Sequence, residues 1–384
     1  MTTNRLPDFK SMLSQLVATP SISCSSPAWD QSNRPVIDLL AGWFTELGFA
    51  CEIQTVDEAR GKYNLLASRG QGSGGIVLAG HSDTVPYDQG GWSYDPFKLT
   101  EADNRFYGLG SCDMKGYFAV IAEAIQSMSD VEFKRPIIIL ATADEESSMS
   151  GARKIAESGR ALGRCAVIGE PTSLIPVRMH KGIMMEVIRI RGQSGHSSNP
   201  ALGRSALDCM HSVLGELIAY RQWLQQHYHH PGFEVSVPTL NLGSIHGGDN
   251  PNRICGLCEL QYDLRPLPGM DINRLREDIC RRLKPVALRF ETDIQVAPLF
   301  PGVAPFETAA DSELVRLSEK LTGRPAESVA FATEAPFLQS TGLETIVLGP
   351  GSIAQAHQPD EFLAFDQVIR SVELIKRLLM YYSS

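Results

Sequence analysis

The sequence lacks a hydrophobic run of the about 18 residues that a membrane-spanning helix needs. Its opening, MTTNRLPDFK, also lacks the apolar core of a secretory signal peptide. Basic residues are not in excess, because 35 Lys and Arg face 44 Asp and Glu and leave a net charge of −9. That balance argues against a nucleic-acid or anionic-membrane binder. We expect a cytoplasmic protein with neither nucleic acid nor membrane as a partner.

The eight cysteines are scattered through 384 residues and do not resemble a disulfide framework. We find no internal repeat and no low-complexity tract. Hydrophobic residues make up 43% and charged residues 21% of the chain, which is ordinary for a globular protein and excludes a disordered one. The length suggests two domains, or one large domain that carries an insertion.

The sequence on both sides of a central segment predicts an α/β domain. Apolar residues at helical spacing predict a helix that starts behind Asn33 and Pro35 and stops at Gly48. Further strands are predicted from continuous apolar runs, which are typical of parallel strands covered by helices on both faces. These runs lie at 76–79, 136–141, 166–168 and 345–348. We expect a large domain, residues 1–181 and 299–384, with a mostly parallel central sheet flanked by helices.

The pattern changes between residues 182 and 298. Alternating strand-like runs and two amphipathic helices follow one another in the order β-α-β-β-α-β, and the last strand is predicted from the alternation at 288–296. This order suits a small ferredoxin-like α+β domain inserted into the larger one. A final amphipathic helix around 368–379 then returns to the large domain.

Polar clusters begin where the apolar runs end. In open α/β sheets the carboxyl ends of the strands form the ligand crevice, so these clusters are expected to meet there. They are Gly80-His81-Ser82-Asp83, Asp144-Glu145-Glu146, Gly169-Glu170 and, after a loop rich in Gly and Pro, His357.

The residue types in these clusters, with Asp113, indicate a metal site. Nitrogen and oxygen donors without thiolate suit zinc, cobalt or manganese. The set is His81, Asp113, Glu146, Glu170 and His357. Five ligands are too many for one catalytic metal with an open position. Two ions about 3.5 to 4 Å apart that share one carboxylate would use all five.

Two further acidic positions suggest supporting roles. Asp83 lies two residues beyond His81, so on an extended segment its carboxylate is expected to accept the other imidazole N–H. Glu145 and Glu146 are adjacent and are expected to diverge on an extended backbone, so that one binds metal while the other acts as a general base.

Several motifs together resemble the M20 family of dinuclear metallo-aminoacylases and peptidases. They are LAGHSDTVP (78–86), GLGSCDMKG (108–116), ATADEE (141–146), IGEPTS (168–173), RGQSGHSSNPA (191–201) and GPGSIAQAHQPDE (349–361), with SIHGGDNPNRIC (244–255) and DLRPLPGM (263–270) between them. The combination is specific where single motifs would not be. The resemblance implies a catalytic domain and an inserted lid, residues 182–298, through which the protein also dimerises.

The family pattern implies roles for individual residues. It places His81 and Glu170 on one metal and Glu146 and His357 on the other, with Asp113 bridging. It makes Asp83 the support of His81 and Glu145 the base.

Three residues of the inserted domain are candidates for work on the substrate. His196, on a Gly-rich turn, is our candidate donor to the oxyanion. Asn252 and Arg265 are candidates for binding the substrate carboxylate, although Arg265 could equally be a surface or interface cation. Because the family dimerises through this domain, we expect His196 to act across a homodimer interface.

The resemblance implies a metal-dependent amide hydrolase with two divalent ions per subunit, zinc or cobalt. It extends furthest to members that remove the acetyl group from N2-acetyl-L-ornithine, giving L-ornithine and acetate in arginine biosynthesis. Succinyl-diaminopimelate desuccinylation and dipeptide cleavage remain alternatives with the same metal site. A non-catalytic scaffold is a further alternative, because fold does not establish function; the spare Glu145 argues against it.

Overall fold

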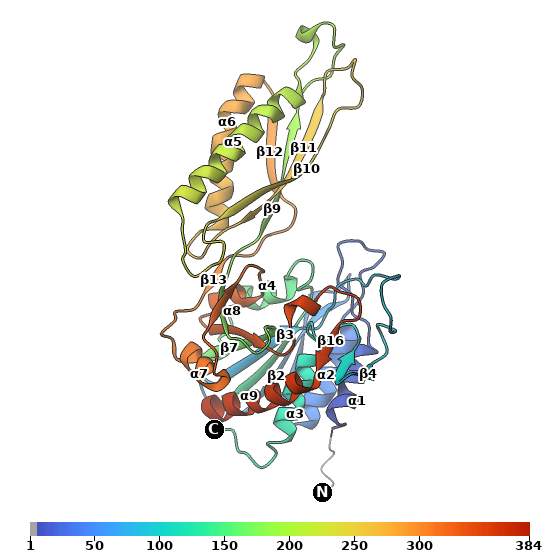
Figure 1. Ribbon diagram of the computed structural model, residues 1–384, viewed down its shortest axis with the longest axis vertical. Helices are drawn as coiled ribbons and strands as arrows, with labels where there is room; N and C mark the ends of the chain where they lie inside the picture. The colour runs from blue at the N-terminus through green and yellow to red at the C-terminus, as the bar shows by residue number, and fades with distance from the viewer. Residues whose placement is uncertain (1–5) are drawn as a thin grey trace. The chain divides into compact units, whose positions relative to one another are not determined.

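The computed structural model describes residues 6–384 and divides into two compact units (Figure 1). The first unit contains the described residues up to Arg178 together with Thr308–Glu327 and Thr333–Ser384. The second unit contains Met179–Glu307 and Ser328–Ala332. Residues 1–5, which the sequence analysis assigns to the large domain, lie outside the described residues.

The first unit is built on a mixed sheet with a parallel centre. Its strands run in the order β1-β2-β6-β3-β7-β15-β8. β6, β3, β7 and β15 are mutually parallel, and antiparallel strands extend the sheet at both ends. The prediction of a mostly parallel central sheet is therefore confirmed. The bounds are β1 (Ala50–Asp57), β2 (Lys62–Arg69), β3 (Ile76–His81), β6 (Ile137–Thr142), β7 (Cys165–Pro171), β8 (Val177–His180) and β15 (Glu344–Gly349).

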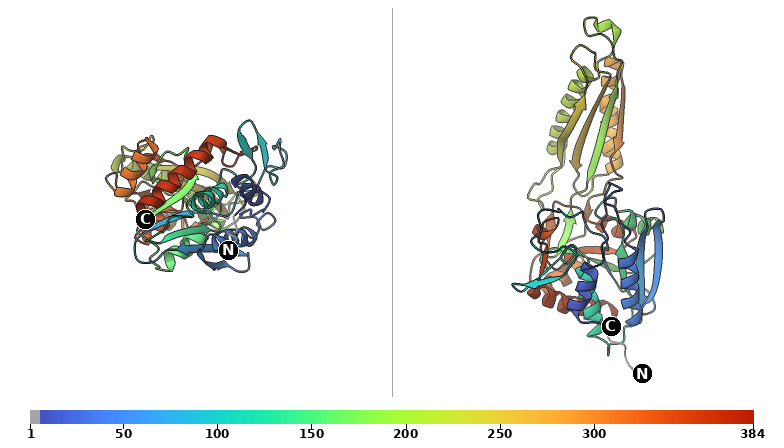
Figure 2. Two further views of the ribbon diagram at one scale, coloured as in Figure 1. Left: turned by 90° about the horizontal axis from the view of Figure 1, so that it is seen from below. Right: turned by 90° about the vertical axis from the view of Figure 1, so that its right-hand side faces the viewer.

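Helices cover both faces of this sheet. Ile76 and Leu78 of β3 share one hydrophobic cluster with α2, α3 and α9, whereas Val77 and Ala79 point to the opposite face and are buried as well. Continuous apolar strands are the consequence, because neither face meets water. α3 and α9 pack side by side (Figures 1 and 2). The helices are α1 (Phe9–Val17), α2 (Arg34–Glu46), α3 (Gly116–Gln126), α4 (Ser150–Glu157), α7 (Glu313–Thr322), α8 (Ala335–Ser340) and α9 (Phe365–Ser383).

A small antiparallel sheet stands beside this core. It pairs β16 (Phe362–Ala364) with β5 (Arg105–Tyr107), and β5 with β4 (Thr100–Ala102). The remaining short strands are β13 (Phe306–Glu307) and β14 (Glu327–Val329).

The second unit is an antiparallel sheet with two helices on one face (Figure 1). The strand order is β10-β11-β9-β12, and the chain order is β-α-β-β-α-β as predicted. The elements are β9 (Met184–Arg191), α5 (Ala206–His227), β10 (Thr239–Gly247), β11 (Leu257–Arg265), α6 (Ile272–Phe290) and β12 (Asp293–Pro298), with a short 3-10 turn at Pro200–Leu202.

The strand predicted over 288–296 begins later than expected. α6 continues through Pro285 to Phe290, and Glu291 ends it in a left-handed conformation. The helix buries Leu275, Ile279 and Leu283 at helical spacing, while Leu288 is 72% exposed. The alternation around Leu288 was therefore not the buried face of a strand. No helix among residues 6–384 has the length and apolarity needed to cross a membrane.

Candidate metal centre

The ends of the parallel strands deliver the candidate ligands. His81 is the last residue of β3, Glu170 lies in β7, and Glu146 lies in the turn after β6. His357 follows β15 beyond the short 3-10 turn Ile353–Gln355, and Asp113 stands before α3. Ligand atoms of His81, Asp113 and Glu170 lie within 4.8 Å of one another, and so do those of Asp113, Glu146 and His357. All five residues predicted to bind metal are therefore brought together.

The Asp113 carboxylate belongs to both of these ligand groups: one of its oxygens faces the group with His81 and Glu170, and the other faces the group with Glu146 and His357. Its Oδ1 lies 3.1 Å from His81 Nε2, which is itself 3.9 Å from Glu170 Oε1. Its Oδ2 lies 3.7 Å from His357 Nε2, which is itself 3.0 Å from Glu146 Oε2. Donors about 2.1 Å from one tetrahedral zinc ion lie roughly 3.4 Å apart, so each group has the spacing of one coordination shell. The residues present fit two cations that share Asp113.

The ion pairs and pKa shifts of the site also favour bound cations. Within residues 6–384, the ion pairs of Asp113, Glu146 and Glu170 are with His81 or His357. Burial and the neighbouring acidic groups raise the pKa of Glu170 well above its ordinary value. The hydrogen bond to Glu146 raises the pKa of His357 to about 9. Groups whose pKa is raised in this way would release their protons on binding divalent ions.

Asp83 differs from its predicted role. His81 Nδ1 lies 3.0 Å from the backbone carbonyl of Asp83, whereas the Asp83 Oδ1 atom is 3.8 Å away. The carboxylate instead accepts the backbone N–H groups of Glu145 and Glu146, at 3.3 and 3.1 Å. The reason is that the chain bends after His81, where the expectation assumed an extended segment. Asp83 therefore fixes the ring of His81 through its backbone and the Glu145–Glu146 turn through its side chain.

Glu145 and Glu146 converge, which corrects the expectation that they diverge. Asp144 has a φ of 59°, and its carbonyl accepts the N–H groups of residues 147–149, so the backbone turns sharply where an extended strand was expected. As a result, ligand atoms of His81, Glu145 and Glu146 lie within 4.8 Å of one another. Burial and the neighbouring Glu170 raise the pKa of Glu145 well above its ordinary value.

Sequence reasoning missed the charged network that holds this turn. The buried Asp144 carboxylate accepts from Arg60 at 2.6 Å and pairs with Lys62 at 3.1 Å, and Ser23 donates to it at 2.7 Å. Lys62 is buried and also pairs with Asp30 at 2.9 Å. Burial opposes ionisation, but the Ser23 hydrogen bond and the charge of Lys62 hold the pKa of Asp144 below its ordinary value. The only sequence signal is the pair of cations two residues apart at the start of β2.

The second unit places His196 and Asn252 together and Arg265 elsewhere. Ser197 N donates to Asn252 O at 3.1 Å, next to a backbone bridge between His196 and Arg253. Both His196 and Asn252 are exposed. Arg265 ends β11 and donates to Asp263 at 2.9 Å. Asn252 lies in the loop before β11, at the opposite end of that strand from Arg265. Because β11 extends over nine residues, roughly 26 Å separates its two ends. Asn252 and Arg265 of the same subunit therefore cannot both bind one small substrate.

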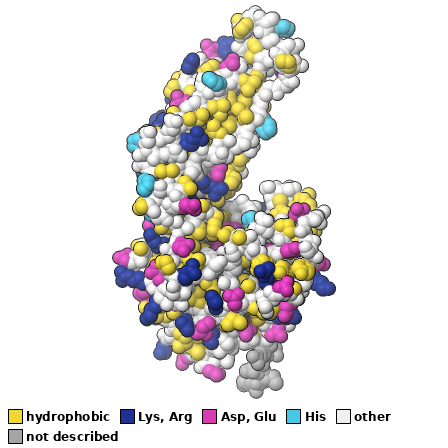
Figure 3. All heavy atoms as spheres, viewed as in Figure 1, with side chains coloured by type: hydrophobic (Ala, Val, Ile, Leu, Met, Phe, Trp, Pro, Cys, Tyr) yellow, Lys and Arg dark blue, Asp and Glu magenta, His cyan; other side chains and the backbone are white. Residues whose placement is uncertain are grey.

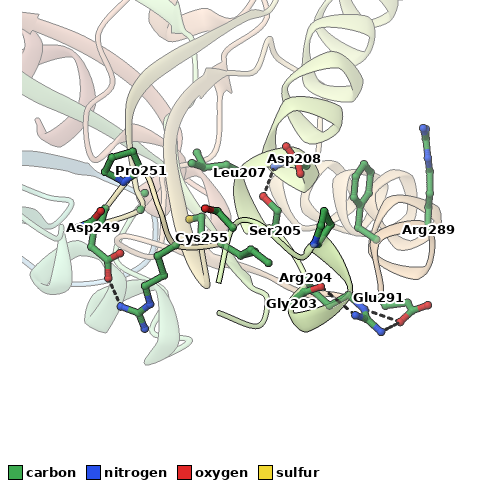
Figure 4. Close-up of a pocket in the computed structure, with 18 residues that line it drawn as sticks. Gly203, Arg204, Ser205, Leu207, Asp208, Asp249, Pro251, Cys255, Arg289 and Glu291 are labelled. Carbon is green, nitrogen blue, oxygen red and sulfur yellow. Dashed lines mark hydrogen bonds and ion pairs between the residues drawn. The ribbon is translucent and has the colours of Figure 1, made fainter. Parts of the chain in front are cut away.

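A pocket of about 820 Å³ opens beside His196 and Asn252 (Figure 4). It is lined by segments of the loops 197–205 and 247–255 and by the end of α6. Charged side chains are among its lining residues: Arg204 pairs with Glu291, as Figure 4 shows, and Arg253 pairs with Asp249. The candidate metal ligands are not among its lining residues.

The sequence matches the family model described as peptidase family M20/M25/M40 over residues 77–381. The chain belongs to this family. It is 52% identical over 379 residues to the acetylornithine deacetylase of Klebsiella pneumoniae (strain 342), with 99% of each chain covered. It is 50% identical over 378 residues to the acetylornithine deacetylase of Edwardsiella ictaluri (strain 93-146), with 98% of each covered. This M20 protein is thus similar to those enzymes from end to end.

Solved structures share the fold of this M20 protein at low identity. Aminopeptidase PepT from Bacillus cereus has a TM-score of 0.75 at 19% identity, and 99% of this chain and 98% of that chain are covered. The metallo-carboxypeptidase Sso-CP2 from Sulfolobus solfataricus has a TM-score of 0.73 at 17% identity, with 97% and 99% covered. A dinuclear metal-binding M20 peptidase from Bacillus subtilis has a TM-score of 0.67 at 14% identity, with 97% of each covered.

Proposed function

We propose that this protein hydrolyses the acetyl amide of N2-acetyl-L-ornithine and releases L-ornithine and acetate, a step of arginine biosynthesis. The observation that carries the proposal is the identity of 50% or more, over 98% or more of each chain, to enzymes named acetylornithine deacetylase. The cluster of five metal-ligand residues with an adjacent free carboxylate supports it. The absence of a long apolar helix among residues 6–384 and the eight free cysteines agree with the proposed cytoplasmic location.

We propose that two divalent ions, zinc or cobalt, bind in each subunit. His81 and Glu170 would hold one and Glu146 and His357 the other, with Asp113 shared, as the two oxygens of Asp113 support. When bound, such ions polarise a carbonyl and make water more acidic. Ligand atoms of Glu145 lie within 4.8 Å of those of His81 and Glu146, but Glu145 belongs to neither of the two ligand groups that contain Asp113. We propose that it takes the proton of the attacking water and passes it to the leaving amine.

His196 is proposed as the donor to the oxyanion. The Ser198 N–H donates to His196 Nδ1 at 3.2 Å, so the neutral ring carries its proton on Nε2. That N–H is the kind of donor that stabilises a developing negative charge. Asn252, beside His196, is proposed to bind the substrate carboxylate through its amide. Arg265, with its charge already paired to Asp263, remains proposed for the same carboxylate, but from the other subunit than Asn252, or for an interface.

We propose that the protein is a homodimer joined through the second unit. β10 is an edge strand of that unit's sheet, and an unpaired edge invites pairing with another chain. Leu207 and Ile218 of α5 and Ile245 of β10 are exposed although large and apolar. Figure 3 shows hydrophobic side chains gathered on one face of this unit, as at interaction surfaces. In such a dimer His196 would serve the partner's metal site.

Subunit exchange tests the shared site. His196→Ala and Glu145→Ala should each be nearly inactive alone. A mixed dimer would contain one site with both groups intact and one with neither. Random exchange at equal amounts makes half the dimers mixed, so activity should recover to about a quarter of wild type. No recovery from dimers shown to be mixed would confine His196 to its own subunit.

Substrate preference tests the function itself. kcat/KM should be highest for N2-acetyl-L-ornithine among that compound, succinyl-diaminopimelate and a dipeptide, assayed with zinc or cobalt supplied. An equal or reversed preference for the succinyl substrate would move the assignment to the desuccinylase. Cleavage of the dipeptide alone would move it to a dipeptidase.

A further inference from the structure

Glu361 is a fully buried carboxylate that no step of the proposed reaction uses. It follows His357 by four residues and immediately precedes β16. Its Oε1 accepts the backbone N–H groups of Cys112 at 2.7 Å and Asp113 at 2.9 Å, and its Oε2 accepts that of Gly110 at 3.0 Å. One side chain thus holds the backbone of the loop that presents Asp113.

Glu361 joins the loop that carries Asp113 to the loop that carries His357. Asp113 belongs to both candidate ligand groups, and His357 belongs to the second. β16 pairs with β5, and Gly108 N donates to the Glu361 carbonyl at 3.0 Å, so the loop after β5 starts against Glu361. A Cβ on Gly351 would collide with Cys112 Sγ, and the φ of Gly351 is +80°, so glycine permits this close approach.

We propose that Glu361 is a positioning residue that sets Asp113 against His357 and thereby sets the affinity for the metal pair. The proposal rests on the two-ion site of the proposed function. Glu361 does not touch the ions or the substrate. It acts through the peptide N–H groups that fix the direction of Asp113, in the way that groups behind metal ligands orient them.

The neighbouring Asp360 supplies a matched control. It accepts the N–H groups of Ser93 and Tyr94, at 2.8 and 3.3 Å, and so anchors a loop that contains no candidate ligand. Its φ of 57° is one that Asn tolerates well. Asp360→Asn and Glu361→Gln are therefore the same chemical change on adjacent residues, with only the second affecting the Asp113 loop.

The test is a calorimetric titration of metal-free full-length protein with Co²⁺, followed by the visible spectrum of the saturated protein. Glu361→Gln should weaken binding of at least one ion by about 10–100-fold, the usual effect of losing such a supporting group. It should also change the Co²⁺ spectrum, which a loss of stability alone would leave as in wild type. Asp360→Asn should match wild type in both. Glu361→Asp keeps the charge but is one methylene too short to accept all three N–H groups, so it should weaken binding as well.

The outcomes separate this inference from the proposed function. If wild type binds two ions and folded Glu361→Gln and Glu361→Asp bind them with wild-type affinity and spectrum, the positioning role is overturned and the proposed function stands. If wild type never binds more than one ion, this inference and the two-ion part of the proposed function are overturned, while the proposed deacetylation is still decided by substrate preference. If Glu361→Gln does not fold, Glu361→Asp decides between the same outcomes.

Discussion

Replacing Glu145 and Glu146 one at a time by Gln should separate proton transfer from metal binding. General bases contribute about 10²–10⁴-fold, so Glu145→Gln should lower kcat by at least about a hundredfold, or about 2.7 kcal/mol of activation free energy. Its metal content should stay at the wild-type level. Glu146→Gln should lower metal affinity, because Glu146 Oε2 lies 3.0 Å from His357 Nε2 within the second ligand group.

The structure explains why neither change should displace the turn. Asp83 holds the backbone N–H groups of both residues, and the carbonyl of Asp144 holds those of the next three. None of these bonds uses the side chain of Glu145 or Glu146. Gln also has nearly the volume of Glu, so the comparison changes one charge at a time.

The measurements are kcat at saturating metal and the metal content of gel-filtered protein. Wild type and the two variants are treated in parallel. Equal loss of metal from both variants would show that the adjacent pair does not divide the work as proposed. Near-wild-type kcat in Glu145→Gln would remove Glu145 from the role of base.

Three further predictions follow from individual groups. Elemental analysis of fully loaded protein should give close to two metal equivalents, with activity lost on chelation; one equivalent with full activity would remove the bridging role from Asp113. Lys62→Met deletes a buried partner of Asp144 and should destabilise the protein by about 3–5 kcal/mol in chemical denaturation. Arg34→Met breaks an exposed ion pair with Asp38 and should have a much smaller effect. Equal effects of the two changes would contradict the importance of the charged network around Asp144. Burial lowers the pKa of His180 from 6.5 to about 4, so between these pH values the unfolded chain binds a proton that the folded chain does not. The free energy of unfolding should therefore fall by about 3 kcal/mol as the pH is lowered from 6.5 to 4. His180→Gln should flatten that part of a pH series of unfolding midpoints, and an unchanged slope would refute the assignment of the effect to His180.

The sequence predicted the parts of the fold and site that depend on local pattern. Continuous apolar runs identified β3, β6, β7 and β15, because strands buried on both faces admit no polar alternation. Polar residues directly after such strands must then meet at one edge of a parallel sheet. His81 and Glu170 could be placed near each other on that ground alone.

The rest depended on backbone geometry that no residue spacing encodes. The positive φ of Asp144 turns two carboxylates toward one cluster where an extended chain would separate them. The Asp83 carboxylate accepts backbone N–H groups 62 and 63 residues away, which is a property of the folded chain only. Likewise Ile369 is an apolar residue of the amphipathic helix expected around 368–379, yet its side chain is 71% exposed, because helical spacing alone does not fix where the buried stripe of that helix ends.

The acidic groups around the site can be sorted by what neutralises them. Asp144 has Lys62 and Arg60, whereas Asp83 and Glu361 have backbone N–H groups. Three further carboxylates, Asp113, Glu146 and Glu170, face histidines that are themselves good metal ligands. Buried charge must be compensated or neutralised, and within residues 6–384 the ion pairs of these three acids are with those histidines and with no Lys or Arg. Divalent ions would supply the compensation that the histidines do not, whereas Asp144, Asp83 and Glu361 already have fixed partners, so the packing that holds these supporting acids in place also separates them from the acids that are left to bind metal.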